Sequence, residues 1–146
     1  MAVVTELAAV EGILRRTRTV AVVGASSVPS RAGFYVGEYL ARVGYRVYPV
    51  NPRRVRETIW GRPVLSSLAE LPEPVDMVDM FRRSKLIPGH VDEILALPWS
   101  PRVVWLQLLV WHLESAERLS AAGIDVVQNR CTMADHQRFG LQAVME

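Results

Sequence analysis

Short apolar runs alternate with helix-like patterns along this chain. The first run, residues 19–23, reads TVAVV and is followed at once by Gly24. A run this short, rich in β-branched residues and unbroken by strongly polar ones is typical of a strand buried on both faces of a sheet. Residues 34–43 then place apolar side chains at helical spacing until Gly44, a residue type that commonly ends helices. The pattern therefore predicts a buried strand, a turn and a helix in succession.

The same alternation continues toward the C-terminus. Repeated strand–helix–strand units imply right-handed crossovers and a parallel sheet covered by helices. We therefore predict an α/β fold, in which residues 1–146 form a single Rossmann-like domain with a mainly parallel five-stranded sheet and helices on both faces. Residues 59–64 fit a connector with a short strand at most. The other strands are predicted at 45–50, 75–81, 102–107 and 124–127, and the other helices at about 4–16, within 85–97, at 113–122 and from 134 onward.

Length and composition exclude several classes of protein. The chain has 146 residues, of which 50% are hydrophobic, so it can bury a core and does not have the composition of a disordered protein. No apolar run approaches the roughly 18 residues that a membrane-spanning helix needs. The N-terminal segment places its arginines after its apolar residues, which is the reverse of a signal peptide. We therefore expect a soluble, cytoplasmic protein that does not bind membranes.

Few residues are candidates for catalysis or metal binding. Cys131 is the single cysteine, which excludes an internal disulfide, and the three histidines lack metal-ligand spacing. Cys131 and His136 could form a nucleophile–base pair, but a lone cysteine is more often a small buried residue. Asp76 and Asp79 are unusual in a buried parallel strand, and three residues apart they point to opposite faces and cannot share a proton. We therefore expect no catalytic residue and no metal, and Asp76 to meet an arginine.

The basic residues of the chain are almost all arginines. There are 17 Lys and Arg residues against 15 Asp and Glu, and Lys85 is the single lysine. Arginine presents a planar fork of donors that suits anions, although a compositional bias of the source organism would also explain the excess. The net charge of +2 and the scatter of the arginines do not fit a nucleic-acid-binding stripe. The positions of the arginines are therefore more informative than their number.

The turn after the first strand has the character of a phosphate site. In open α/β sheets, ligands bind beyond the C-terminal ends of the strands, where the strand order reverses. Small residues let a phosphate approach the backbone, and the N-terminus of the following helix offers free N–H groups. The turn is not a GxGxxG motif, and a tight turn without a ligand is the alternative. The residues that could contribute are Gly24, Ala25, Ser26, Ser27 and Arg31.

The end of the second strand lacks the acidic residue of an NAD site. An NAD enzyme places a carboxylate there for the ribose 2′-hydroxyl, whereas this chain reads Asn51-Pro52-Arg53-Arg54. Guanidinium groups bind a phosphate with paired hydrogen bonds, so the segment favours a nucleotide with an extra ribose phosphate, such as NADP or coenzyme A. The alternative is a solvated loop.

The end of the third strand adds an aromatic residue and two more cations, Phe81-Arg82-Arg83. The ring could pack against a base or a pantetheine chain, and the guanidinium groups could contact phosphate. Three successive strand ends thus carry groups that suit an anion.

Four segments together resemble the CoA-binding domain family. They are residues 20–53, which include VAVVGASSV and YPVNPR, and the later EPVDMVDMFRR, VVWLQ and AGIDVVQNRC, in the order that this family shows. The family consists of small stand-alone Rossmann-like proteins that are similar to the N-terminal domain of succinyl-CoA synthetase α-subunits. The resemblance covers about residues 13–133.

The resemblance implies a coenzyme A site formed by residues 24–27, 51–53 and 81–83, near Gln107. It also implies no catalytic centre, because the phosphorylated histidine of the ligases lies in a second domain that this chain does not reach. One departure is Leu109, where relatives usually have glycine and where leucine could crowd the pocket. We therefore predict a non-catalytic protein that binds coenzyme A or an acyl-CoA, with a protein partner as a further option. The alternative is an NADP-linked oxidoreductase module.

Overall fold

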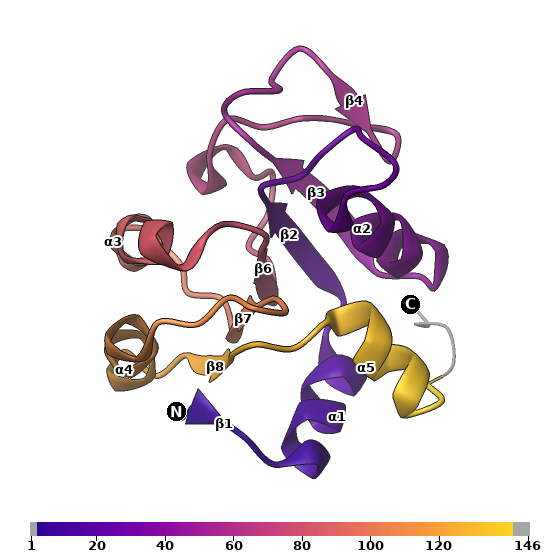
Figure 1. The fold of residues 1–146 in the computed structure, drawn as a ribbon. Helices are drawn as coiled ribbons and strands as arrows, with labels where there is room; N and C mark the ends of the chain where they lie inside the picture. The colour runs from indigo at the N-terminus through magenta and orange to yellow at the C-terminus, as the bar shows by residue number, and fades with distance from the viewer. Residues whose placement is uncertain (1–2, 142–146) are drawn as a thin grey trace.

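A six-stranded parallel sheet forms the centre of the computed structural model, which describes residues 3–141 (Figure 1). Strand β2 has β3 on one side and β6 on the other, so the strand order reverses between β2 and β6. A crevice for ligands is expected at such a reversal. The strands in sheet order are β1 (Val3–Val4), β8 (Asp125–Val127), β7 (Val103–Leu106), β6 (Met77–Met80), β2 (Thr19–Val23) and β3 (Arg46–Val50).

Helices cover both faces of the sheet. Figure 1 shows α3 and α4 on one side and α1, α2 and α5 on the other, and the core is accordingly divided into two clusters. All five residues of β2 are buried, with Ala21 and Val23 in one cluster and Val20 and Val22 in the other. This two-sided burial is the reason that the strand reads as an unbroken apolar run. The helices are α1 (Leu7–Arg16), α2 (Ala32–Arg42), α3 (Ile87–Leu95), α4 (Leu113–Ala121) and α5 (Thr132–Arg138).

The predicted α/β fold is confirmed, but the predicted number of strands is wrong. The sixth strand is β1, whose two residues pair with Val126 and Val127 of β8. Two residues are too few to carry a periodic signal, and the predicted helix at 4–16 accordingly begins only at Leu7. The last helix begins at Thr132 rather than at 134. No helix among residues 3–141 has the length and apolar character needed to cross a bilayer.

A small hairpin follows β3 and packs on α2. Its strands are β4 (Thr58–Ile59) and β5 (Arg62–Pro63), so the predicted connector contains two short antiparallel strands. The Trp60 side chain donates a hydrogen bond from Nε1 to the Phe34 carbonyl oxygen at 3.2 Å. A Cβ atom at Gly37 would lie 2.2 Å from Cζ2 of the same indole ring, so only glycine permits this contact. The contact holds the segment after β3 beside the turn that begins α2.

Two 3₁₀ turns complete the described part of the chain. One, at Leu68–Glu70, lies between the hairpin and β6, and the other, at Ser84–Leu86, leads directly into α3. The second turn begins directly after the predicted site residues Phe81, Arg82 and Arg83, which follow β6.

Candidate functional site

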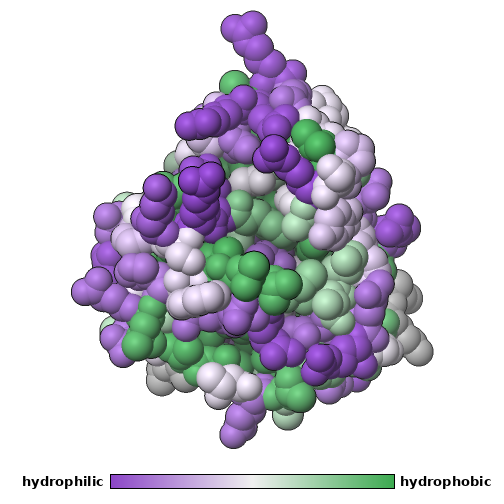
Figure 2. All heavy atoms as spheres, viewed as in Figure 1, coloured by the Kyte–Doolittle hydropathy of each residue, from purple (hydrophilic) through white to green (hydrophobic). Residues whose placement is uncertain are grey.

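A cavity of about 550 Å³ lies at the C-terminal ends of the strands, at the point where the strand order reverses. Figure 2 shows the hollow on this face of the molecule, with hydrophilic side chains gathered on one rim and hydrophobic side chains along the other. Most of the predicted site residues line it, so four segments distant in sequence come together here. Those lining residues are Gly24, Ala25, Ser26, Arg31, Asn51, Arg54, Phe81, Arg82, Arg83 and Gln107.

Three predicted residues lie outside this lining. Arg53 lines an adjoining cavity of about 420 Å³, which it shares with Arg82, Arg83 and Lys85. Ser27 does not line a cavity itself, but it contacts Arg54, which does: Arg54 Nη1 donates a hydrogen bond to the Ser27 hydroxyl at 2.8 Å. Pro52 lines neither cavity.

The turn after β2 is tightly packed, and its first amides are already used. Gly24 has φ +89°, and a Cβ atom there would lie 2.4 Å from the Phe81 carbonyl oxygen. The N–H groups of Gly24 and Ala25 both donate to the Val50 carbonyl, and that of Ser26 donates to the Gly33 carbonyl. These three amides are therefore not available to a phosphate.

Free amide donors lie instead at the start of α2. Within the described chain, the N–H groups of Ala32 and Gly33 have no hydrogen-bond partner, as expected for the first turn of a helix. Both residues line the larger cavity, beside Arg31 at the N-cap position. The positive end of the helix thus faces the cavity, and it provides the anion-binding groups that the preceding turn does not.

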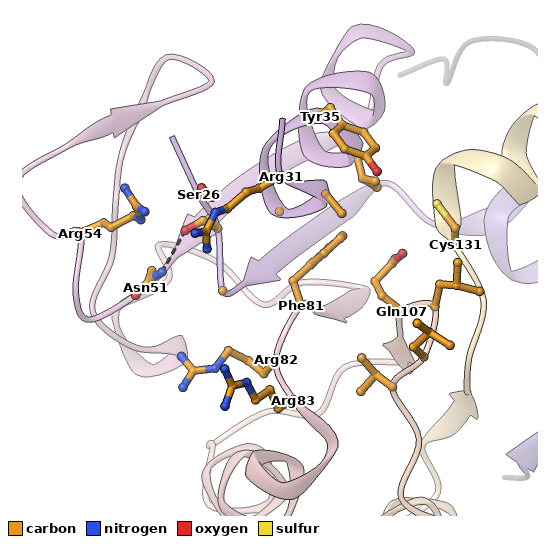
Figure 3. Close-up of a pocket in the computed structure, with 18 residues that line it drawn as sticks. Ser26, Arg31, Tyr35, Asn51, Arg54, Phe81, Arg82, Arg83, Gln107 and Cys131 are labelled. Atoms are coloured by element: carbon orange, nitrogen blue, oxygen red, sulfur yellow. Dashed lines mark hydrogen bonds between the residues drawn. The ribbon is translucent and has the colours of Figure 1, made fainter. Parts of the chain in front are cut away.

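Asn51 connects the end of β3 to the first turn. Its Nδ2 donates to the Ala25 carbonyl oxygen at 2.9 Å (Figure 3). Its Oδ1 accepts from the Arg53 N–H at 3.0 Å. The side chain therefore helps to fix the shape of the cavity. Arg54 is also partly committed, because Nη1 lies 3.3 Å from Glu57 Oε2.

A group of cations borders the two cavities without neutralising carboxylates. Figure 3 shows Arg82 and Arg83 extending to the Asn51 side of Phe81, while Gln107 lies on the opposite side. No Asp or Glu of the described chain lines either cavity or forms an ion pair with these residues. Such a group is suited to a polyanionic ligand. We call it the cation cluster, and its members are Arg31, Arg53, Arg82, Arg83 and Lys85.

At the other end of the larger cavity, the lining residue Gln107 is hydrogen-bonded to a buried carboxyl group, that of Asp79. Asp79 is fully buried on β6, and its Oδ1 accepts from Gln107 Nε2 at 2.6 Å. Its Oδ2 accepts from the Thr132 hydroxyl at 3.0 Å. Burial raises the pKa of Asp79 to about 7, although the two hydrogen bonds oppose this shift. The sequence signal for this buried carboxyl group is an acidic residue inside an otherwise apolar strand, whereas nothing in the sequence pattern pointed to Thr132 as its partner.

Leu109 lies at the rim of the cavity in a left-handed backbone conformation. Its φ is +68°, and its N–H donates to the Asn129 side-chain oxygen at 2.7 Å. The side chain is 72% exposed, so most of it faces solvent rather than the interior of the cavity. A positive φ is the physical reason for glycine at this position, because a Cβ atom is disfavoured there.

The structure does not join Cys131 and His136 into a catalytic pair. Cys131 lines the cavity, and burial raises the pKa of its thiol, which opposes thiolate formation. The His136 ring is buried, and its Nδ1 lies 2.6 Å from the Tyr39 hydroxyl. Asp76 lies 4.0 Å from Arg102, which confirms that it meets an arginine. Among residues 3–141, no three His, Cys, Asp or Glu side chains could together hold a metal ion.

Comparison with known proteins bears on this site. A family model described as a CoA binding domain matches residues 18–137. The chain is 34% identical to YneT, an uncharacterized protein of Bacillus subtilis, over 88% of this chain and 93% of the relative. A solved structure of cell-free ID.343 from Thermus thermophilus is 42% identical, with a TM-score of 0.86 over 92% of this chain and 98% of that one. The α subunit of an ADP-forming acetate–CoA ligase of Pyrococcus furiosus is 35% identical over 52% of this chain, but over only 17% of the subunit.

Proposed function

This chain belongs to the CoA-binding domain family, and from that premise we propose that it binds coenzyme A or an acyl-CoA at the C-terminal ends of its parallel strands. In this proposal, the chain is a single binding domain without a catalytic centre. The observation that carries it is the cation cluster, which borders the cavity at the strand-order reversal without neutralising carboxylates. Coenzyme A has a diphosphate, a ribose 3′-phosphate and a long arm, so it needs both cations and a cavity.

The cavity residues fit these groups in two parts. The free N–H groups of Ala32 and Gly33, together with Arg31, suit the diphosphate, because helix N-termini favour anions. Arg82 and Arg83, with the other cations of the smaller cavity, suit the ribose 3′-phosphate. The ring of Phe81 separates this cationic part from the end of the larger cavity that Gln107 lines (Figure 3).

Thermal unfolding with four nucleotides tests the proposal. A ligand at 100 times its Kd adds about 2.7 kcal/mol to the free energy of unfolding. We expect coenzyme A to raise the Tm, dephospho-CoA to raise it less because the 3′-phosphate is missing, and NAD to have no effect. Stabilisation by NADP alone would contradict the proposal and favour the NADP-linked oxidoreductase module.

Replacement of Arg82 and Arg83 by alanine tests the assignment of the phosphate. We expect the double variant to lose the difference between coenzyme A and dephospho-CoA. Arg118→Ala is the matched control, since Arg118 is half exposed on α4, pairs with Asp92 and does not line either cavity. If both variants bind coenzyme A as the unmodified protein does, the assignment of the 3′-phosphate to these arginines is wrong.

A further inference from the structure

Gln107, Asp79 and Thr132 form a closed triangle of hydrogen bonds at the inner end of the cavity. Gln107 Nε2 lies 2.6 Å from Asp79 Oδ1 and 3.0 Å from Thr132 Oγ1. The Thr132 hydroxyl in turn donates to Asp79 Oδ2 at 3.0 Å. All three residues are at least nine-tenths buried. Because Nε2 has two protons and each has an acceptor, the nitrogen of the Gln107 amide is fully used.

The donors of this triangle fix which way the amide points. Gln107 Nε2 faces both acceptors, and while Asp79 is ionised its carboxylate can only accept hydrogen bonds, so the Gln107 oxygen faces away from it. Within the described chain, Gln107 Oε1 has no hydrogen-bond partner, and it is not among the side-chain atoms that are sealed from solvent without one. Gln107 lines the cavity between Phe81 and Cys131 (Figure 3). The cavity therefore ends in one carbonyl oxygen within mostly apolar surroundings.

We propose that Asp79 and Thr132 orient Gln107 so that its side-chain oxygen accepts a hydrogen bond from an amide N–H of the pantetheine arm. This inference rests on the proposed coenzyme A function and assigns the arm to one end of the cavity. Gln107 contacts the ligand, whereas Asp79 is a positioning residue that acts through it. An acceptor in apolar surroundings favours a donor strongly, because leaving a buried polar group unpaired is costly.

Asp79→Asn tests the inference without replacing a residue that lines the cavity. The new amide can donate to Gln107 Oε1, which turns the Gln107 nitrogen toward the ligand and replaces an acceptor with a donor. At pH 8, where Asp79 of the unmodified protein is ionised, we expect the affinity for coenzyme A to fall about tenfold, while that for 3′-phosphoadenosine 5′-diphosphate, which lacks the arm, stays unchanged. A tenfold loss corresponds to about 1.4 kcal/mol, near the upper range for one hydrogen bond.

Two further variants separate positioning from folding. Thr132→Val removes one acceptor of the Gln107 amide. Like Asp79→Asn, it should lower the affinity for coenzyme A relative to that for 3′-phosphoadenosine 5′-diphosphate. Asp76→Asn is the matched control. The Asp76 carboxylate also accepts two hydrogen bonds, in its case from the backbone N–H groups of Arg18 and Thr19, but it lies just before β6 begins, at the opposite edge of the sheet. The ratio of the affinities for coenzyme A and 3′-phosphoadenosine 5′-diphosphate does not depend on the fraction of folded protein, since both ligands are measured on the same preparation by calorimetry.

A chemical change in the ligand provides an independent measurement. Two coenzyme A analogues can be made in which an ester oxygen replaces one of the two amide N–H groups of the arm. We expect one of the two analogues to bind the unmodified protein more weakly than coenzyme A does. The same analogue should lose nothing relative to coenzyme A on the Asp79→Asn variant. An unchanged affinity ratio in Asp79→Asn, with no effect of either ester, would overturn the inference while leaving the proposed function intact. Failure of both coenzyme A and the diphosphate to bind the unmodified protein would overturn both.

Discussion

Leu109 holds a backbone conformation that residues with a Cβ atom rarely adopt. Its φ of +68° costs about 1–2 kcal/mol relative to the right-handed region, and little burial offsets that cost because the side chain is 72% exposed. We expect Leu109→Gly to raise the free energy of unfolding by up to about 1 kcal/mol, since the flexibility of glycine in the unfolded chain cancels part of the gain. Urea denaturation measures this directly.

Leu108→Gly is the comparison for that variant. Leu108 is 61% exposed and lies next to Leu109, but its φ is not positive. There, glycine should lower the free energy of unfolding by about 0.5–1 kcal/mol. Equal shifts in the two variants would show that the left-handed conformation at Leu109 stores no strain.

Asp79 should make the stability of the protein fall as the pH rises. Burial raises its pKa from 3.8 to about 7, so between these values the folded state holds a proton that the unfolded state has lost. Stability that is complete below about pH 4 is therefore lost progressively up to about pH 7, by as much as about 1.4 kcal/mol per pH unit. The measurement is the free energy of unfolding at a series of pH values.

The contribution of Asp79 is isolated by subtracting the same series for Asp79→Asn. His136 has an opposite effect, because burial lowers its pKa and the folded state gains stability as the pH rises toward 6.5. That effect is common to both proteins and cancels in the difference. A difference that is flat from pH 5 to pH 7 would mean that Asp79 stays ionised in the folded protein.

At the residue scale, the sequence located the candidate site better than it assigned roles within it. The residue types after the first three buried strands predicted where an anion would bind, because the C-terminal ends of parallel strands share one edge. The roles depend on partners that the sequence does not bring together. Gly24 donates to Val50, and Asn51 to Ala25, so both are structural. Arg54 is paired with Glu57 while Arg53 is not, although the two arginines are adjacent.

At the scale of elements, the contact between α2 and the β4–β5 hairpin depends on Gly37. A methyl group there would lie 2.2 Å from the Trp60 ring, which is held by its hydrogen bond to Phe34. We expect Gly37→Ala to lower the free energy of unfolding by about 1–3 kcal/mol, the usual cost of overpacking. It should also weaken ligand binding, because the hairpin follows the segment that contains Arg53.

Gly89→Ala serves as the control for this substitution. Gly89 is also a helix residue, in α3, but no atom lies within 4 Å of the position of a Cβ atom there. Alanine should therefore stabilise the protein by up to about 1 kcal/mol through its higher helix propensity. Chemical denaturation measures the free energy of unfolding of Gly37→Ala and Gly89→Ala. A loss of stability in both variants would refute the explanation that the Gly37 substitution clashes with Trp60.

The elements that the sequence predicted well are those with a strong period or an unbroken apolar run. The strand at 19–23 was predicted to the residue, and the helices α2 and α4 to within two residues at each end. The elements that it missed or underestimated have two residues per strand: β1 was not predicted, and β4 and β5 form two strands where one short strand at most was expected. β1 pairs with β8, which is distant in sequence, whereas β4 and β5 pair with each other across Trp60 and Gly61. In both cases two residues are too few to show a strand period.

At the scale of the whole molecule, the small net charge of +2 conceals a strong local charge. The cation cluster gathers five basic residues at one edge of the sheet, while several acidic residues, among them Glu73 and Asp92, pair with arginines elsewhere. Coenzyme A binding should therefore weaken several-fold as the salt concentration rises from 0.1 M to 1 M, over which the screening length falls from about 10 Å to about 3 Å. Calorimetric titrations at several salt concentrations test this.

The salt dependence should decrease when the cluster is reduced. In the Arg82→Ala, Arg83→Ala double variant, the slope of log Kd against log salt should be smaller, whereas Arg118→Ala should retain the full slope. Identical slopes in all three proteins would mean that the cation cluster does not attract the ligand electrostatically.

Strand β1 has a consequence for the order in which the molecule is assembled. Among residues 3–141, Val3 and Val4 pair only with β8 within the sheet, and β8 is the last strand of this part of the chain. A ribosome that synthesises this protein releases β1 first, yet the partner of β1 emerges only after nearly all of the other elements. We therefore expect the site-bearing strands β2, β3 and β6 to associate during synthesis, and the N-terminal strand to join as the final step. The same strand should be the first to detach in the folded protein, with the fastest amide hydrogen exchange in the sheet.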